Sequence, residues 1–154
     1  AKDQKEVEFP PGLDICAIKG EGDWEKVTID SAAEESACPL KWGEQFGVQR
    51  VTPGKEMRLV TASGEAIEHL GARRVKFSTE SASGDMKKMN MGFQVCGVKK
   101  PLAAVWRICE SGNIVQFGPK DEDCYISNKK SGDKVYMRRE GGSYVLDMKF
   151  EKTF

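Results

Sequence analysis

Short stretches in which apolar and polar residues alternate recur along most of the chain, separated by turn-forming residues. Residues 73–77 (Arg-Arg-Val-Lys-Phe) alternate throughout, and residues 24–29 alternate toward their end. Alternation with a period of two predicts strands with one buried face. Further strands are predicted at 57–61, 66–67, 92–96, 114–117, 125–126, 135–137 and 144–148, with turns at 62–65, 81–85 and 118–119. Many short strands joined by turns predict a closed or folded-over all-β domain.

One segment in the C-terminal half has a helical period instead. The residues spaced at i, i+3, i+4 and i+7 are Leu102, Val105, Trp106 and Cys109. This spacing predicts one short helix whose apolar face is buried, so Trp106 is expected in the core. Pro101 suits the first turn of that helix, and Gly112 suits the position just after its last turn.

Length and charge limit the classes of protein to consider. The 154 residues suffice for one domain with a substantial core. We expect that domain at 13–154, preceded by a charged arm at 1–12 that ends in Pro-Pro-Gly. Lysine plus arginine and aspartate plus glutamate both number 24, which argues against a nucleic-acid binder. No apolar run is long enough to span a membrane, and residues 1–5 lack the apolar core of a signal peptide.

The cysteines and the single histidine give no metal or disulfide pattern. The five cysteines include no closely spaced pair, so a zinc site and a disulfide scaffold are not expected, and reduced thiols are. His69 lies among Glu68, Arg73 and Arg74, residues that are expected to be exposed. A cysteine–histidine nucleophile pair would need a third group to orient the imidazole, and none is evident.

The candidate catalytic residue is Asp30, which directly follows the strand predicted at 24–29. A strand that delivers an aspartate into a tight turn holds the carboxylate rigidly, and the hydroxyl of Ser31 is expected to lock that turn. Two such carboxylates brought together cannot both ionise, so one becomes a general base and the other a general acid. No other aspartate of the chain is followed by serine or threonine, so the pair needs two chains. Taken alone, an Asp-Ser pair at a strand end is more often a turn or a helix cap than a catalytic site.

Motifs in order along the chain add a family resemblance. Residues 29–33 (Ile-Asp-Ser-Ala-Ala) resemble the hydrophobic–Asp–Ser/Thr–Gly–Ala signature of retroviral-type aspartic proteases. Residues 60–67 resemble the flap hairpin of that family, and Gly71 and the strand through Phe77 follow as they do there. Residues 102–112 and 114–117 resemble its second hydrophobic motif, helix and following strand in the form found in copia-type retrotransposons. The resemblance spans about residues 24 to 150.

This resemblance implies a retropepsin-like closed β-barrel with a flap hairpin, one short helix and a homodimeric active site. It implies an aspartic endopeptidase that cuts extended segments of its own polyprotein, in the cytoplasm or inside a virus-like particle, with no metal or cofactor. The implied residues are Asp30 and Ser31 for catalysis, Ala32, Ala33, Ala62, Ser63, Gly64 and Glu65 for substrate binding, and Glu35 with Arg107 as a supporting pair. No nucleic acid or membrane partner is implied.

One position departs from the family pattern. Ala32 stands where the family has a glycine, which lets the backbones of substrate and partner approach the carboxylates closely. This leaves a different class of function open, a peptide-binding or assembly module that keeps the fold and the dimer without catalysis. A third alternative is a monomeric polyprotein domain whose catalytic pair forms only in an assembled particle.

Overall fold

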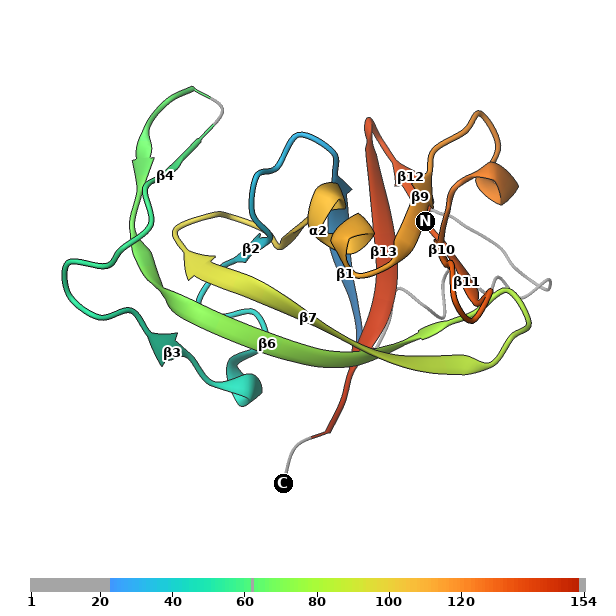
Figure 1. The fold of residues 1–154 in the computed structure, drawn as a ribbon, viewed down its shortest axis with the longest axis horizontal. Coiled ribbons are helices and arrows are strands. Elements are labelled where there is room, and N and C mark those ends of the chain that lie inside the picture. Colours follow the sequence, from blue (N-terminus) through green and yellow to red (C-terminus); the bar gives the residue numbers. More distant parts are fainter. Residues whose placement is uncertain (1–22, 62, 153–154) are drawn as a thin grey trace.

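The regular structure is almost entirely strand in the computed structural model, which describes residues 23–61 and 63–152 (Figure 1). The strands are β1 Trp24–Asp30, β2 Ala37–Cys38, β3 Gln49–Arg50, β4 Leu59–Val60, β5 Ala66–Ile67, β6 His69–Glu80, β7 Met86–Cys96, β8 Leu102–Ala104, β9 Asn113–Gln116, β10 Tyr125–Asn128, β11 Lys134–Tyr136, β12 Arg138–Glu140 and β13 Ser143–Phe150. One α-helix, α2 (Val105–Glu110), and two 3-10 turns, η1 (Glu44–Phe46) and η2 (Asp121–Asp123), complete the described elements. The all-β class is confirmed.

The main sheet has eight strands in the order β12-β13-β1-β8-β2-β7-β6-β3. Strand β13 also pairs with β6, through Lys149 with Ser78 and Phe150 with Phe77. The pairings therefore run from β13 through β1, β8, β2, β7 and β6 back to β13. Figure 1 shows the long β6–β7 hairpin crossing the lower part of the molecule, with the β4–β5 hairpin near one end and the β9–β11 sheet near the other.

The β6–β7 hairpin is longer than the sequence pattern indicated. The expected strands at 73–77 and 92–96 are parts of strands of 12 and 11 residues. Gly71 lies at an irregularity in their register, and a Cβ atom there would come within 2.2 Å of the carbonyl oxygen of Gln49. Glycine at this position therefore allows β3 to approach β6.

The hydrophobic core lies between the paired strands. Its largest fully buried side chains are Phe77, Phe93, Met137, Leu146 and Met148. Burying side chains of this size contributes about 1.5–3 kcal/mol each relative to leaving them exposed. Trp42 is partly buried against this core, and its ring centroid lies 5.2 Å from that of Phe93 and 4.9 Å from that of Phe150.

The helix differs from its prediction at its start and in its buried face. Residues 102–104 form β8 instead of a first helical turn, because they pair with β1 in parallel. Ile108 is the buried residue of α2, whereas Cys109 is exposed and Trp106 is 46% exposed. The prediction that Trp106 belongs to the core is therefore wrong. The predicted end is right, since Gly112 follows the helix with a φ of 91°.

Further expectations concern the N-terminal arm, the cysteines and membrane-spanning segments. The arm predicted at 1–12 and the start of the domain at 13 lie outside the described residues, as does Cys16. Of the other cysteines, Cys38, Cys96 and Cys124 are buried, Cys109 is exposed, and all four are free thiols. In the described ranges, no helix is long and apolar enough to cross a membrane.

Candidate active site

Asp30 is the last residue of β1, and a parallel neighbour holds it from one side. Thr28 pairs with Leu102, and Asp30 pairs with Ala104 at the end of β8. Ala104 is fully buried, whereas the Asp30 side chain remains partly exposed. The strand pairing therefore fixes the backbone that carries the carboxylate and leaves the carboxylate accessible.

The turn after β1 is closed by the aspartate itself. The backbone N–H of Ala32 donates to Oδ1 of Asp30 across 2.9 Å, a local contact typical of aspartate in turns. Ser31 was expected to lock the turn, but among the described residues its hydroxyl has no hydrogen-bond partner within the chain. Ser31 and Ala32 are both exposed, and Ala33 is partly exposed. The turn thus presents three small residues at the surface beside the carboxylate.

Three contacts from β8 and α2 tether the segment that follows the turn. The backbone N–H of Ala104 donates to Oγ of Ser36 across 2.9 Å, and Ser36 is 3% exposed. The indole N–H of Trp106 donates to the carbonyl oxygen of Glu34 across 2.6 Å. The third contact is the ion pair described next. Sequence reasoning missed Ser36 and the indole contact, whose partners lie about 70 residues away.

The expected pair of Glu35 and Arg107 is present. Nη2 of Arg107 lies 3.2 Å and 2.9 Å from the two carboxylate oxygens of Glu35, and Nη1 lies 3.0 Å from Glu110. The hydrogen bond to Glu35, followed by that to Glu110, raises the pKa of Arg107 above its ordinary value. Because the pair is partly exposed, it orients the segment more than it stabilises the fold.

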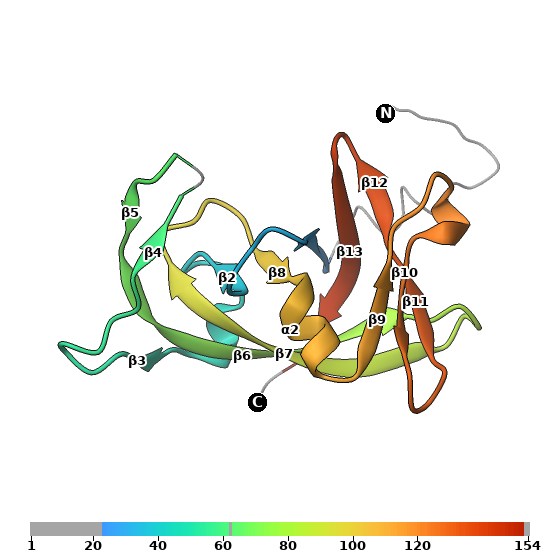
Figure 2. The same ribbon diagram turned by 45° about the horizontal axis from the view of Figure 1, so that its top comes forward.

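The predicted flap corresponds to the β4–β5 hairpin. Leu59 pairs with Ile67, and the turn is closed by a 2.8 Å hydrogen bond from Thr61 N–H to the carbonyl oxygen of Glu65. Gly64 has a φ of 89°, a conformation that favours glycine. In Figures 1 and 2 this hairpin rises on the same side of the molecule as the end of β1.

Side chains at the hairpin tip form a small polar network. The hydroxyls of Thr61 and Ser63 lie 2.9 Å apart, and Ser63 donates to Glu65 across 3.3 Å. Ala62, the remaining predicted tip residue, lies outside the described residues. Of the predicted substrate-binding residues, Ser63, Gly64 and Glu65 therefore sit together at the tip, and Ala32 and Ala33 sit together in the Asp30 turn.

His69 fastens the base of this hairpin. Its Nδ1 accepts a hydrogen bond from the backbone N–H of Met57 across 3.0 Å, and its Nε2 lies 2.7 Å from Oε1 of Gln94. A backbone N–H can only donate, so Nδ1 carries no proton and Nε2 donates to Gln94. His69 itself is partly buried, and both of its ring nitrogens have hydrogen-bond partners.

Arg73 was expected to be exposed, and it is only 3% exposed. Its guanidinium donates to the carbonyl oxygens of Gly47 across 2.7 Å, of Leu40 across 3.1 Å and of Trp42. This buried cation therefore holds the segment between β2 and β3 through backbone carbonyls. Burial raises the pKa of the neighbouring Cys38 thiol to about 11, although Arg73 acts in the opposite direction, so this thiol is not an activated nucleophile.

An open groove of about 820 Å³ lies between α2 and the β6–β7 hairpin. Its lining includes Glu35, Ser36 and Arg107 but neither Asp30 nor the β4–β5 hairpin. The groove therefore borders the tethered segment and does not contain the candidate catalytic carboxylate. Comparisons of the chain with protein-family models, with curated proteins and with solved structures find no match.

Proposed function

We propose that this chain is one half of an aspartic endopeptidase with the retropepsin architecture, a closed β-barrel with a flap that works as a two-fold homodimer. The observation that supports this most is the setting of Asp30. Its partly exposed side chain stands on the last residue of a strand, directly before a turn of small residues, and the segment around it is held by β8 and α2. This arrangement is what a carboxylate needs if it must meet a second carboxylate in a fixed geometry.

In the proposed mechanism, Asp30 of each protomer contributes one carboxyl group. The two share one proton, because two carboxylates at short distance cannot both ionise. The ionised carboxylate takes a proton from a water molecule while the oxygen of that water attacks the scissile carbonyl carbon. The protonated carboxyl group donates its proton to the carbonyl oxygen. The tetrahedral intermediate collapses when the C–N bond breaks: the leaving nitrogen takes a proton from the protonated carboxyl group, and a hydroxyl group of the intermediate gives its proton to the ionised one, so the pair again holds one proton.

The β4–β5 hairpin acts as a flap over an extended peptide. Its tip residues Ser63, Gly64 and Glu65 form a compact polar turn that can close on the peptide backbone and exclude water. The peptide is held mainly through its main chain, as in other cases in which an extended strand is recognised. The proposed substrate is a segment of the polyprotein that contains this chain, in the cytoplasm or inside a virus-like particle.

A second candidate function rests on Ala32, which is exposed beside Asp30. A methyl group at this position restricts how closely a substrate can approach Asp30. If catalysis is lost for that reason, the dimer would serve as a peptide-binding or assembly module. Against this, no described non-glycine residue has a positive φ, so the turn closes without the conformational freedom of glycine. The turn geometry therefore does not require glycine at position 32, and the effect of the methyl group on substrate binding is what the Ala32→Gly variant tests.

The test is cleavage of a peptide library at mildly acidic pH by the protein and by its Asp30→Asn variant, with pepstatin as inhibitor control. The proposal expects cleavage that pepstatin inhibits and that Asp30→Asn reduces at least 1,000-fold, because the variant retains the geometry but lacks the acid–base pair. Cleavage that survives in Asp30→Asn would contradict the proposal.

The Ala32→Gly variant separates the two candidate functions. An enzyme that tolerates alanine should change its kcat/KM by less than about tenfold, which corresponds to about 1.4 kcal/mol. If the native dimer cuts no peptide and Ala32→Gly restores cleavage, the binding module is the better description of the native chain.

A further inference from the structure

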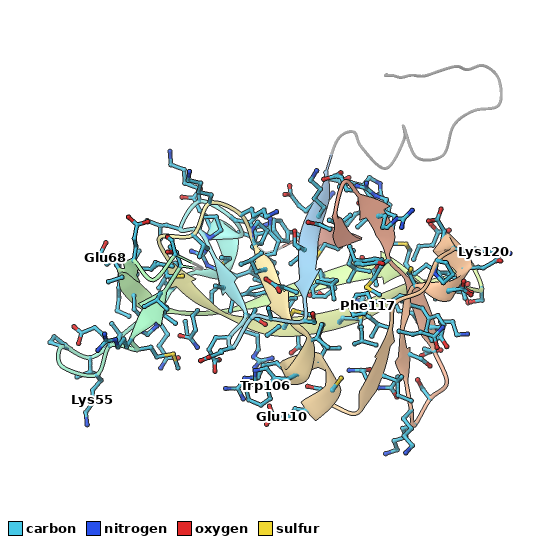
Figure 3. The ribbon with its side chains drawn as sticks, turned by 90° about the horizontal axis from the view of Figure 1, so that it is seen from above. Lys55, Glu68, Trp106, Glu110, Phe117 and Lys120 are labelled. Atoms are coloured by element: carbon cyan, nitrogen blue, oxygen red, sulfur yellow. The ribbon has the colours of Figure 1, made fainter. Side chains whose placement is uncertain are left out.

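An exposed indole lies next to the Asp30 turn. Trp106 is 46% exposed and donates to the carbonyl oxygen of Glu34 across 2.6 Å. It also follows Ala104, the parallel partner of Asp30, by two residues. Trp106 is therefore attached to the turn through both the strand pairing and a side-chain hydrogen bond, and its ring lies at the surface of α2 (Figure 3).

A second exposed ring, that of Phe117, directly follows β9 and packs against the strand on the other side of β1. Phe117 is 36% exposed, and its ring centroid lies 4.7 Å from that of Tyr144. Tyr144 of β13 pairs with Ile29, the residue before Asp30. Strand β1 lies between β13 and β8 in the sheet, so Phe117 and Trp106 are linked to opposite neighbours of β1 near its end.

We infer that Trp106 and Phe117, together called the aromatic flanks, are contacts for a second copy of this chain. This inference rests on the proposed function, because an Asp30 pair requires the second copy to reach this turn. The turn residues Ser31 and Ala32 are small and exposed, so no large side chain separates this turn from a second copy. Protein interfaces are enriched in aromatic residues, and tryptophan is prominent among those that contribute most to affinity.

The indole is held in place before any partner arrives. The guanidinium carbon of Arg107 lies 4.0 Å from the centroid of the Trp106 ring, and Arg107 is itself fixed by its bonds to Glu35. The indole N–H is bound to Glu34. A side chain that is already ordered loses little conformational entropy on association, so more of its contact energy appears as affinity.

The experiment measures the monomer–dimer dissociation constant by sedimentation over a concentration series. Trp106→Ala and Phe117→Ala are each expected to raise this constant at least tenfold. Trp106→Phe keeps a ring but removes the bond to Glu34, and it is expected to raise the constant by less than Trp106→Ala does. Tyr136→Ala is the matched control, because Tyr136 is 43% exposed on β11, a strand that pairs with neither β1 nor β8. Urea unfolding of each variant under monomeric conditions checks that the fold is retained.

The outcomes separate this inference from the proposed function. If the native chain dimerises and both alanine variants dimerise as tightly, the aromatic flanks are not interface residues, and the proposed function stands. Unchanged dimerisation with a raised KM for peptide cleavage also overturns the inference, since the rings then face substrate. A native chain that stays monomeric at every concentration and cuts no peptide overturns both.

Discussion

The hydroxyl oxygen of Ser36 accepts the backbone N–H of Ala104 across 2.9 Å, and this bond joins the segment after Asp30 to the strand that pairs with Asp30. Both residues are almost fully buried, so the N–H has no access to water if the hydroxyl is removed. Ser36 also receives the N–H of Gln94 on its carbonyl oxygen, across 2.8 Å. The segment is thus fixed between β7 and β8.

Ser36→Ala is therefore expected to destabilise the fold by about 1–3 kcal/mol, the cost of an unsatisfied buried N–H group. The free energy of unfolding in urea gives the value. Ser31→Ala serves as the control for stability, because Ser31 is exposed and its hydroxyl has no partner in the described chain. Equal stabilities for the two variants would show that the bond to Ala104 contributes nothing.

Replacing Arg73 by methionine is expected to destabilise the fold by about 1–3 kcal/mol, because backbone carbonyl oxygens lose a charged hydrogen-bond donor. The carbonyl oxygens of Gly47, Leu40 and Trp42 would lose their donor. Arg74→Met is the matched control, since Arg74 is the exposed neighbour in β6. Urea unfolding compares the two, and a similar loss in both variants would contradict the role assigned to Arg73.

The case of Arg73 also shows how far the sequence could predict this fold. Strict alternation at 73–77 put Arg73 on the same face as the buried Val75 and Phe77, and this signal was available. Its charge led to the opposite expectation. The carbonyl groups that accept from it come from a segment about 30 residues earlier, and no local pattern reveals where they lie.

The helix and the candidate site were likewise predictable only where local sequence pattern determines the structure. The spacing from Leu102 to Cys109 is helical, but Leu102 forms a strand because Thr28, over 70 residues away, offers a parallel partner. Asp30 at a strand end and the pairing of Glu35 with Arg107 were predicted from local pattern and from resemblance. The contacts of Ser36 and Trp106 depend on this same long-range pairing, which the sequence pattern does not specify.

Thiol accessibility gives a prediction about Cys38. Burial raises its pKa from 9.0 to about 11, so the folded state favours the neutral thiol. Stability from this group is fully present below pH 9 and is lost as the pH rises through 11.

At pH 8, a thiol reagent should modify the exposed Cys109 quickly and Cys38 only at the rate of unfolding, with mass spectrometry identifying the sites. Rapid modification of Cys38 in folded protein would contradict its burial.

Glu140 gives a prediction at acidic pH. The hydrogen bond from Lys26, followed by that from Arg138, lowers the pKa of Glu140 below its ordinary 4.5. A lowered pKa means that the stabilisation is present above pH 4.5 and is lost as the pH falls through the folded value. Because these side chains are about half exposed, the effect should stay below about 1 kcal/mol. The stability difference between the native chain and Glu140→Gln should therefore shrink from pH 7 to pH 3, and a constant difference would contradict it.

The base of the β4–β5 hairpin depends on His69, which links Met57 to Gln94 through its two ring nitrogens. His69→Phe keeps a ring of similar size but removes the acceptor for the Met57 N–H. Losing about 1.4 kcal/mol of local stability raises the population of the open form tenfold, so amide exchange at Thr61, whose N–H bonds to Glu65 within the hairpin, should quicken by about that factor. Glu68→Gln is the control, because it alters the adjacent side chain and leaves both bonds of His69 in place. Unchanged exchange at Thr61 in His69→Phe would mean that the hairpin is held by its strand pairing alone. Faster exchange, with global stability unchanged, would identify His69 as the residue that sets how freely this hairpin opens.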